Sequence, residues 1–226
     1  MISLNTYSFG IGMGLIKGIK KKLKFQDFIN FSKRNHIYKL EFPIDFFLKK
    51  ENKKIEFYFN LLKKSKMTPI IDLEELDEKI IKSLVKLSNI FDFEIIRIKM
   101  SNFFGGNRHD VKNFELTRIK FVKKLKKLIK IIEKSNLKFA IENHQDLNSN
   151  EIIKIIRKTS VKKVGINWDI ANSLATIETP DEFFKKSKKF IINVHSKDYK
   201  VIESNKGFFL KRCTIGEGIV DFKKYI

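Results

Sequence analysis

The runs KFAIE (138–142), VGINWD (164–169) and FIINVH (190–195) decide the fold class of this chain. Each is a short apolar run, and the three end in Glu142, Asp169 and His195, residue types that bind metal ions. The three residues recur every 26 or 27 positions, about the length of one strand-and-helix repeat. Because the carboxyl ends of parallel barrel strands meet at one rim, we expect these side chains to converge there. The sequence therefore predicts a metal site and suggests a metal-dependent enzyme.

The same alternation of strand and helix extends outward over the rest of the chain. The predicted strands cover 2–8, 38–42, 69–73, 94–100, 137–142, 163–169 and 191–195, and the predicted helices cover 25–35, 51–64, 75–88, 114–134, 150–158 and 180–188. A loop with Gly105-Gly106 follows the fourth strand. Apolar strands of this kind are typical of a parallel sheet that is buried on both faces. We predict an α/β protein with a (β/α)₈ TIM barrel, and a single domain over residues 1–226.

Two features bear on this prediction. The doubly wound sheet is the competing fold, but GIGMG (10–14) lacks the Gly-x-Gly-x-x-Gly spacing expected after its first strand. Residues 221–225 begin what should be the seventh helix, so the eighth strand-and-helix unit is missing from this sequence. A barrel without its eighth strand exposes two sheet edges. We therefore expect either that the barrel is C-terminally incomplete here, or that another chain covers the gap, as in a homo-oligomer.

The charge of the chain is strongly positive, with 47 Lys and Arg against 26 Asp and Glu and a net charge of +21. A field of this size attracts phosphates, nucleic acid or anionic membranes. Nearly all the basic residues are lysines, however, and they are spread over every predicted helix. Base readout favours arginine, whose two-pronged donor matches base edges. We interpret the charge as a solvated surface, and we expect neither a nucleic acid nor a membrane partner.

Cysteine content and hydropathy suggest where the protein works. Cys213 is the one cysteine of the sequence, so no internal disulfide forms and a reducing compartment is expected. The N-terminal residues MISLNTYSFGIGMG lack the basic lead and apolar stretch of a signal peptide. No apolar run approaches the length of a membrane span. The sequence therefore predicts a cytoplasmic protein.

Four segments of the chain resemble successive motifs of one known family. The segments IENHQD (141–146), INWDIANS (166–173), VHSKDY (194–199) and IGEGIVDF (215–222) resemble the xylose isomerase-like TIM barrels, the sugar phosphate isomerase/epimerase family that also includes the endonuclease IV class. The resemblance covers the fifth to seventh strands by motif and the first four by architecture. It implies that Glu142, Asp169 and His195 bind one divalent ion, with Mn²⁺, Mg²⁺, Co²⁺ and Zn²⁺ all suited to such ligands.

The resemblance also implies roles for neighbouring residues. Those expected to contact substrate are Asn143, His144 and Lys197, and those expected to support the ligands or shape the surrounding loops are Asp198, Asn172 and Glu217. Glu41 ends the second predicted strand and is expected at the same rim, with an ion pair to one of the lysines as the alternative. Two departures stand out. Family members complete the metal site with a Glu from strand eight, and many carry a His at the position of Asn172.

The chemistry implied is isomerisation or epimerisation of a sugar or sugar-derived hydroxy-ketone. A divalent ion stabilises the enediolate that forms when the proton beside the carbonyl is removed, and Glu142 is the expected acid or base. A decarboxylase, dehydratase or lyase acting on a sugar acid uses the same site. Two further alternatives are an endonuclease IV-like phosphodiesterase, which the four histidines of the chain do not favour, and a non-catalytic barrel that only binds a ligand.

Overall fold

The computed structural model of the protein describes residues 2–16, 18, 23–102, 108, 111–205 and 207–225. The chain forms two compact units. The first comprises Met1–Ile98 and Leu128–Lys138, and the second comprises Lys99–Lys127 and Phe139–Ile226. The helix α6 (Val111–Ile132) contributes its first part to the second unit and its last residues to the first.

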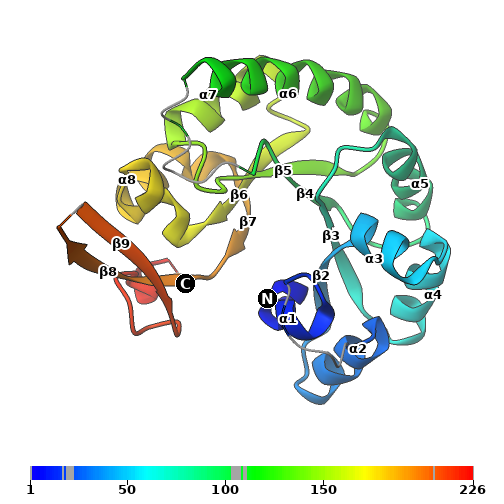
Figure 1. Ribbon diagram of the computed structural model, residues 1–226. Helices are drawn as coiled ribbons and strands as arrows, with labels where there is room; N and C mark the ends of the chain where they lie inside the picture. The colour runs from blue at the N-terminus through cyan, green and yellow to red at the C-terminus, as the bar shows by residue number, and fades with distance from the viewer. Residues whose placement is uncertain are drawn as a thin grey trace. The chain divides into compact units, whose positions relative to one another are not determined.

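Parallel strands in chain order form the sheet of the first unit. They are β1 (Leu4–Asn5), β2 (Lys39–Pro43), β3 (Thr68–Leu73) and β4 (Ile95–Lys99). The helical segments between them are η1 (Thr6–Phe9), α1 (Gly10–Met13), α2 (Phe25–Arg34), α3 (Ile44–Glu51), α4 (Ile55–Lys64) and α5 (Glu78–Ser88). Helices α2, α4 and α5 lie along one face of these strands (Figure 1), as helices do in a parallel βα fold.

Aromatic side chains fill the space between these strands and helices. The ring of Phe25 in α2 packs edge-on against Phe42 of β2 at a centroid distance of 4.8 Å. It also contacts Phe47 of α3 and Tyr58 of α4, each at 5.2 Å. All four side chains are fully or almost fully buried. Edge-to-face packing of this kind adds to the burial of apolar area, so it fixes α2, α3 and α4 against β2.

The segment between β2 and β3 differs from the sequence prediction of a single helix over 51–64. The structure has two helices there, α3 and α4, because Asn52 adopts a left-handed backbone with φ 48° and ends α3. Asparagine tolerates this conformation better than most residues. The first strand is also shorter than predicted, since Thr6 already begins the 3₁₀ segment η1.

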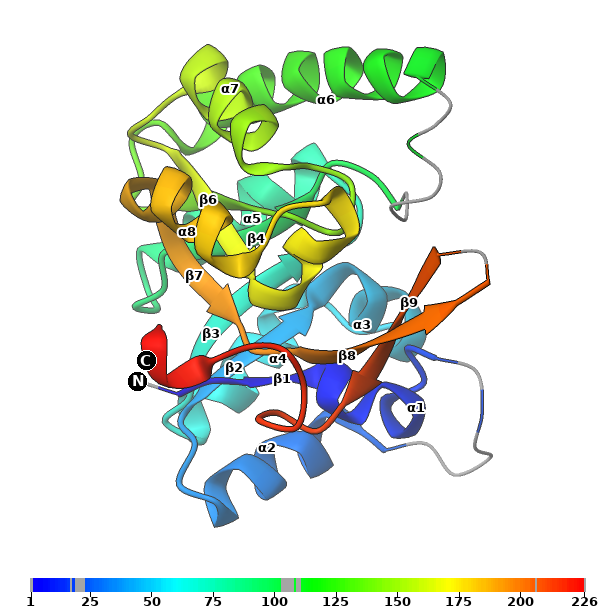
Figure 2. The ribbon, with the colours of Figure 1, turned by 90° about the vertical axis from the view of Figure 1, so that its left-hand side faces the viewer.

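The second unit contains three further parallel strands in chain order and one hairpin. The strands are β5 (Lys138–Glu142), β6 (Val164–Asp169) and β7 (Ile191–His195), joined by α7 (Ser149–Thr159), η3 (Ile170–Thr176), α8 (Pro180–Ser187) and η4 (Lys188–Phe190). The antiparallel hairpin of β8 (Asp198–Ser204) and β9 (Gly207–Cys213) follows β7, and η5 (Phe222–Lys224) comes after it (Figure 2). No element was predicted for the hairpin.

Alternation along β6 separates the core of this unit from its site. Trp168 points to the helical side, where its ring stacks on Phe183 and Phe184 of α8 and meets Tyr225 edge-on. Its neighbour Asp169 projects to the opposite side of the strand, because successive strand residues face opposite ways. The strand therefore anchors α8 with one residue and presents a carboxylate with the next.

The strand order agrees with the predicted barrel. Seven parallel strands follow one another along the chain, and helical segments separate successive strands. Residues 103–107, 109 and 110 of the predicted Gly105-Gly106 loop lie outside the described residues. Among the helices that the structure describes, none combines the length and the apolar character needed to cross a bilayer.

Candidate functional site

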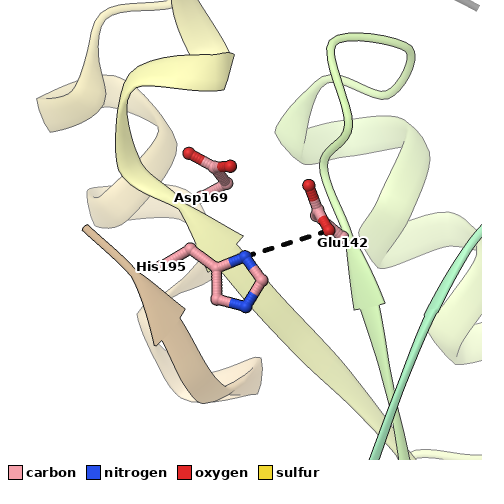
Figure 3. A group of neighbouring side chains, drawn as sticks. All are labelled: Glu142, Asp169 and His195. Atoms are coloured by element: carbon pink, nitrogen blue, oxygen red, sulfur yellow. Dashed lines mark ion pairs between the residues drawn. The ribbon is translucent and has the colours of Figure 1, made fainter. Parts of the chain in front are cut away.

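Three predicted ligands meet at the carboxyl ends of β5, β6 and β7. Each of Glu142, Asp169 and His195 offers one ligand atom, and these atoms all lie within 4.8 Å of one another. Nδ1 of His195 is 3.9 Å from Oε2 of Glu142 (Figure 3). The side chains of Glu142 and Asp169 are 2 % exposed and that of His195 is 16 % exposed. The predicted convergence is confirmed.

A bulge in β7 brings His195 opposite Asp169. The register of β6 with β7 pairs Ile166 with Ile191 and then Asn167 with Asn193, so Ile192 is an extra residue in β7. If the register continued unbroken from the Ile166–Ile191 pair, Asp169 would stand opposite Val194. A glycine permits this arrangement, because a Cβ at position 165 would lie 2.8 Å from three side-chain carbons of Ile192. A glycine inside a strand is the sequence signal for such a bulge.

Asn143 holds the backbone of Asp169 in place. The Asp169 N–H donates to Oδ1 of Asn143 at 2.8 Å, and Nδ2 of Asn143 donates to the Asp169 carbonyl at 3.1 Å. The Asn143 amide thereby extends the hydrogen-bond ladder from β5 to β6 beyond the last strand residue. The side chain is fully buried. Asn143 was expected to contact substrate, and this geometry suits a positioning residue for the neighbouring ligand.

The two carboxylate oxygens of Asp169 have different surroundings. Oδ2 lies 2.6 Å from Nζ of Lys197. Oδ1 is buried and has no hydrogen-bond partner among the described residues. Asp169 stands at the N-cap position of η3, yet its side chain makes no capping hydrogen bond there. Burial raises the pKa of Asp169, against the opposing effect of the Lys197 ammonium. A second cation next to Oδ1 would relieve this cost.

A divalent ion fits the ligands that the chain presents. Two carboxylates and one imidazole form a donor set of oxygen and nitrogen that suits Zn²⁺, Mn²⁺ or Co²⁺, and the carboxylates suit Mg²⁺. The buried Oδ1 of Asp169, which makes no hydrogen bond among the described residues, is an acceptor that a bound ion would satisfy. Glu142, Asp169 and His195 are therefore a possible metal site of this protein.

Four polar side chains gather beside the three ligands. Nζ of Lys197 donates to Oδ1 of Asn172 at 3.1 Å. Nε2 of Gln145 donates to the same Oδ1 at 3.4 Å and to the Tyr199 hydroxyl at 3.3 Å. Burial lowers the pKa of Lys197 and the Asp169 carboxylate raises it, with a net shift upward, so the ammonium stays charged. We call Gln145, Asn172, Lys197 and Tyr199 the donor cluster.

Sequence reasoning identified only half of the donor cluster. Lys197 and Asn172 were predicted near the site, whereas Gln145 and Tyr199 were not. Gln145 has a left-handed backbone with φ 69°, which is uncommon for glutamine and frequent at functional sites. Both residues lie within the motifs IENHQD and VHSKDY, so their membership of these motifs was the available signal.

Asp198 organises the loop that follows the hairpin. Its Oδ1 accepts the N–H groups of Tyr199 at 2.9 Å and Val220 at 3.2 Å, and its Oδ2 accepts those of Gly216 at 3.0 Å and Gly218 at 2.9 Å. Burial alone would raise the pKa of Asp198, but the four donated N–H groups outweigh it and hold the pKa below its usual value. This carboxylate therefore holds the loop in place, and the role expected of it beside the metal ligands stays a prediction.

The remaining predicted residues lie at different places. His144 is half-buried in the loop after β5, next to Asn143. Glu217 is exposed and pairs with Lys200 of β8 at 3.8 Å. Glu41 is buried at 1 % exposure in β2 of the first unit. The roles assigned to these three residues stay predictions.

Asp146 is a buried carboxyl that the sequence did not single out. Oγ of Ser101 donates to Oδ2 of Asp146 at 2.7 Å, which ties the segment after β4 to the loop after β5. Burial raises the pKa of Asp146 to about 7, with the Ser101 hydrogen bond working against this rise. A carboxyl pKa raised by burial in this way is common at functional sites.

Comparison with known proteins identifies the family. A family model described as xylose isomerase-like TIM barrel matches residues 58–226, which is most of the chain. The chain belongs to this family. This membership confirms the family resemblance of the motifs and the predicted barrel fold. The described residues form seven parallel strands of that barrel.

Two curated relatives match shorter parts of the chain. The uncharacterized protein YihM of Escherichia coli is 28 % identical over 120 residues, which is 53 % of this chain and 35 % of the relative. The 3-oxo-isoapionate decarboxylase of Pectobacterium atrosepticum is 24 % identical over 92 residues, 40 % of this chain and 34 % of that enzyme. The match thus spans about a third of the length of each relative.

Solved structures share the fold at low sequence identity. The probable 3-DHS dehydratase AsbF of Bacillus anthracis superposes with a TM-score of 0.68 at 17 % identity, covering 99 % of this chain and 86 % of that one. The IOLI protein with a bound zinc atom gives 0.66 at 14 % identity, covering 99 % and 82 %. A D-tagatose 3-epimerase-like protein gives 0.65 at 16 % identity, covering 97 % and 82 %. The named neighbours thus include an epimerase-like protein and a probable dehydratase.

Proposed function

We propose that this protein is a divalent-metal-dependent isomerase or epimerase of a sugar or sugar-derived hydroxy-ketone. The observation that carries the proposal is the convergence of Glu142, Asp169 and His195 at three neighbouring strand ends, with the buried Oδ1 of Asp169 left without a partner among the described residues. The structural similarity to a D-tagatose 3-epimerase-like protein and to a zinc-bound barrel supports the reaction class and the use of a metal.

The residues of the site have separate tasks in this proposal. Glu142, Asp169 and His195 hold the ion, and Asn143 fixes the backbone of Asp169. A bound divalent ion supplies Lewis-acid stabilisation of the negative charge that develops on the substrate oxygens. Glu142 acts as one acid/base group: it removes the proton from the carbon beside the carbonyl, and it can return it on the same face to the neighbouring carbon. Epimerisation needs a second acid on the opposite face, the role that the family resemblance gives to a Glu of strand eight. Lys197 holds a substrate oxygen, with His144 and Glu41 as further predicted contacts.

Proton exchange tests this proposal without a known substrate. The full-length protein is loaded with Mn²⁺ and incubated in D₂O with D-fructose, D-tagatose, D-psicose and D-xylulose, and NMR measures deuterium at the carbons beside the carbonyl. We expect exchange into at least one ketose, with loss of at least about a hundredfold in Glu142→Gln, the usual range for an acid or base. Glu203→Gln, an exposed glutamate of β8, is the matched control and keeps the activity. A protein that holds no divalent ion, or exchange that persists in Glu142→Gln, would refute the proposal.

A second candidate is decarboxylation of an oxo sugar acid. The similarity to 3-oxo-isoapionate decarboxylase favours it, and the same metal and the same carbanion chemistry would serve. Release of labelled CO₂ from a 3-oxo aldonate, without deuterium exchange into ketoses, would favour this candidate over the first.

A single domain over residues 1–226, a cytoplasmic location and a homo-oligomer remain predictions.

A further inference from the structure

The donor cluster is richer in hydrogen-bond donors than its internal contacts use. Oδ1 of Asn172 accepts from Lys197 and from Gln145. An ammonium group only donates, so the amide atom of Asn172 in contact with Lys197 is the oxygen, and the nitrogen is the other arm of the same amide. That nitrogen, Nδ2, is buried and has no acceptor among the described residues, and Asn172 as a whole is 1 % exposed.

The other members of the cluster leave donors available as well. Nζ of Lys197 carries three N–H donors, and its contacts with Asp169 and Asn172 account for two. The Tyr199 hydroxyl accepts from Gln145 and keeps its own hydrogen to donate. The oxygens of Asp169 and Asn172 in contact with Lys197 are already engaged. A ligand group that accepts hydrogen bonds therefore matches the unused donors of the cluster.

Gln145 is the member whose position is least secured. Its two hydrogen bonds, at 3.4 Å to Asn172 and 3.3 Å to Tyr199, are longer than the usual 2.9–3.0 Å. Its backbone adopts φ 69°, a left-handed conformation that is uncommon for glutamine. A ligand that accepts from Nε2 of Gln145 therefore replaces weak contacts. The Lys197 side chain is 21 % exposed and reachable from solvent.

We propose that the donor cluster binds a carboxylate of the substrate, which makes a keto sugar acid the preferred substrate of the proposed reaction and neutral ketoses weaker substrates. Two oxygens of one carboxylate accept from Lys197, Asn172 and Gln145 together, and a charged acceptor gives shorter and stronger hydrogen bonds than a hydroxyl. This inference rests on the proposed function, since the carboxylate is bound beside the three metal ligands. It narrows the substrate class of the same site.

Two probes that differ only at one end test the inference. D-Gluconate and D-glucitol share a polyol chain and carry a carboxylate or a hydroxymethyl group. Calorimetric titration of the full-length protein, in Mn²⁺ and again in EDTA, should show gluconate binding at least about tenfold tighter, or about 1.4 kcal/mol. Gluconate could also bind by chelating the Mn²⁺ ion directly. The titration in EDTA removes the ion, so any preference for gluconate that remains there comes from the donor cluster.

Isosteric variants then assign the preference to the cluster. Asn172→Asp and Gln145→Glu each replace a donor nitrogen by an acceptor oxygen without changing size, and each should weaken gluconate at least about tenfold while glucitol stays within about twofold. Asn148→Asp is the matched control for the added charge, because Asn148 is the N-cap of α7 and aspartate caps equally well. Metal content and melting temperature are measured for each variant.

The outcomes separate the two proposals. Equal binding of both probes to the wild type, or a gluconate preference that survives in Asn172→Asp and Gln145→Glu, would overturn the carboxylate assignment. A protein that binds no metal overturns the proposed function, and the gluconate preference in EDTA still decides the role of the cluster.

Discussion

Buried carboxylates lie at strand ends in both units of the molecule, but their partners differ. In the first unit Asp72 of β3 accepts a hydrogen bond from Arg97 of β4, and both side chains are buried. In the second unit Asp169 pairs with Lys197, and Glu142 and His195 also offer ligand atoms within 4.8 Å of its own. A strand-end carboxylate is therefore structural where its main partner is the cation of the next strand. It becomes a candidate ligand where the neighbouring strands bring more ligands.

The largest effect is expected from breaking the pair in the first unit. Arg97→Met leaves the Asp72 carboxylate buried without its cation, which should lower the free energy of unfolding by about 3–5 kcal/mol. Urea denaturation measures it. The double variant Arg97→Met/Asp72→Leu removes both charges and should recover most of this loss. A cost below about 1 kcal/mol for the single variant would contradict a structural role for the pair.

Addition of Mn²⁺ should stabilise the protein through the carboxylate of the second unit, Asp169, and not through that of the first, Asp72. Mn²⁺ at a hundred times its dissociation constant should stabilise the wild-type protein by about 2.7 kcal/mol, because it binds only the folded chain. Asp169→Asn should unfold at nearly the same urea concentration as the metal-free wild type and gain nothing from Mn²⁺. Asp72→Asn serves as the comparison and should respond to Mn²⁺ as the wild type does. If Mn²⁺ stabilised the wild type, Asp169→Asn and Asp72→Asn equally, Asp169 would not be a metal ligand and the proposed difference between the two carboxylates would be wrong.

Asp198 offers a third arrangement, in which backbone N–H groups satisfy the carboxylate. Asp198→Asn should cost about 2 kcal/mol at pH 7, because hydrogen bonds to a charged acceptor are lost. The pKa of this group is lowered on folding, so its contribution is complete above the usual value near 4 and disappears as the pH falls through the folded pKa. Denaturation at pH 7, 5 and 3 should show the gap between variant and wild type closing. A gap that stays constant with pH would show that charge is not involved.

The candidate ligands could be predicted from the sequence because each ends an apolar run. Glu142, Asp169 and His195 follow buried strands, and the repeat length placed all three at one rim. The bulge at Ile192 could not be counted from spacing alone, although Gly165 marked it. The prediction that His195 ends its strand was still right. The extra residue lies inside β7, so it changes which residues pair with β6 but leaves His195 as the last residue of the strand.

Other parts of the molecule depend on contacts that a sequence does not display. The β8–β9 hairpin has Val201 and Ile202 beside Glu203 and Lys200, all exposed, so no buried face produced a strand pattern. The two hydrogen bonds from Asn143 to the Asp169 backbone require β5 and β6 to be adjacent, and the left-handed backbone of Gln145 has no counterpart in composition. These features follow from tertiary structure, which overrides local propensity.

The smallest expected effect concerns Tyr7, whose hydroxyl contacts a glutamate next to the Asp72–Arg97 ion pair of the first unit. The hydroxyl of Tyr7 donates to Oε1 of Glu74 at 2.6 Å, and the same oxygen lies 3.6 Å from Nη1 of Arg97. Tyr7→Phe keeps the ring and removes the donor, so the free energy of unfolding should fall by about 1 kcal/mol. Tyr38→Phe, at an exposed tyrosine of the same unit, should change it by less than about 0.5 kcal/mol.

Combining Tyr7→Phe with Arg97→Met then asks whether the three side chains act together. If Tyr7 orients Glu74 for Arg97, the double variant should lose less than the sum of the single losses, since contacting residues couple by about 0.5 kcal/mol or more. If the losses in unfolding free energy simply add, Tyr7 does not orient Glu74 for Arg97. The Asp72–Arg97 pair then stabilises the unit independently of Tyr7. Coupling would extend the contrast with Asp169, because the carboxylates of the first unit would then share one network with Arg97, whereas Asp169 lies in a group of potential metal ligands.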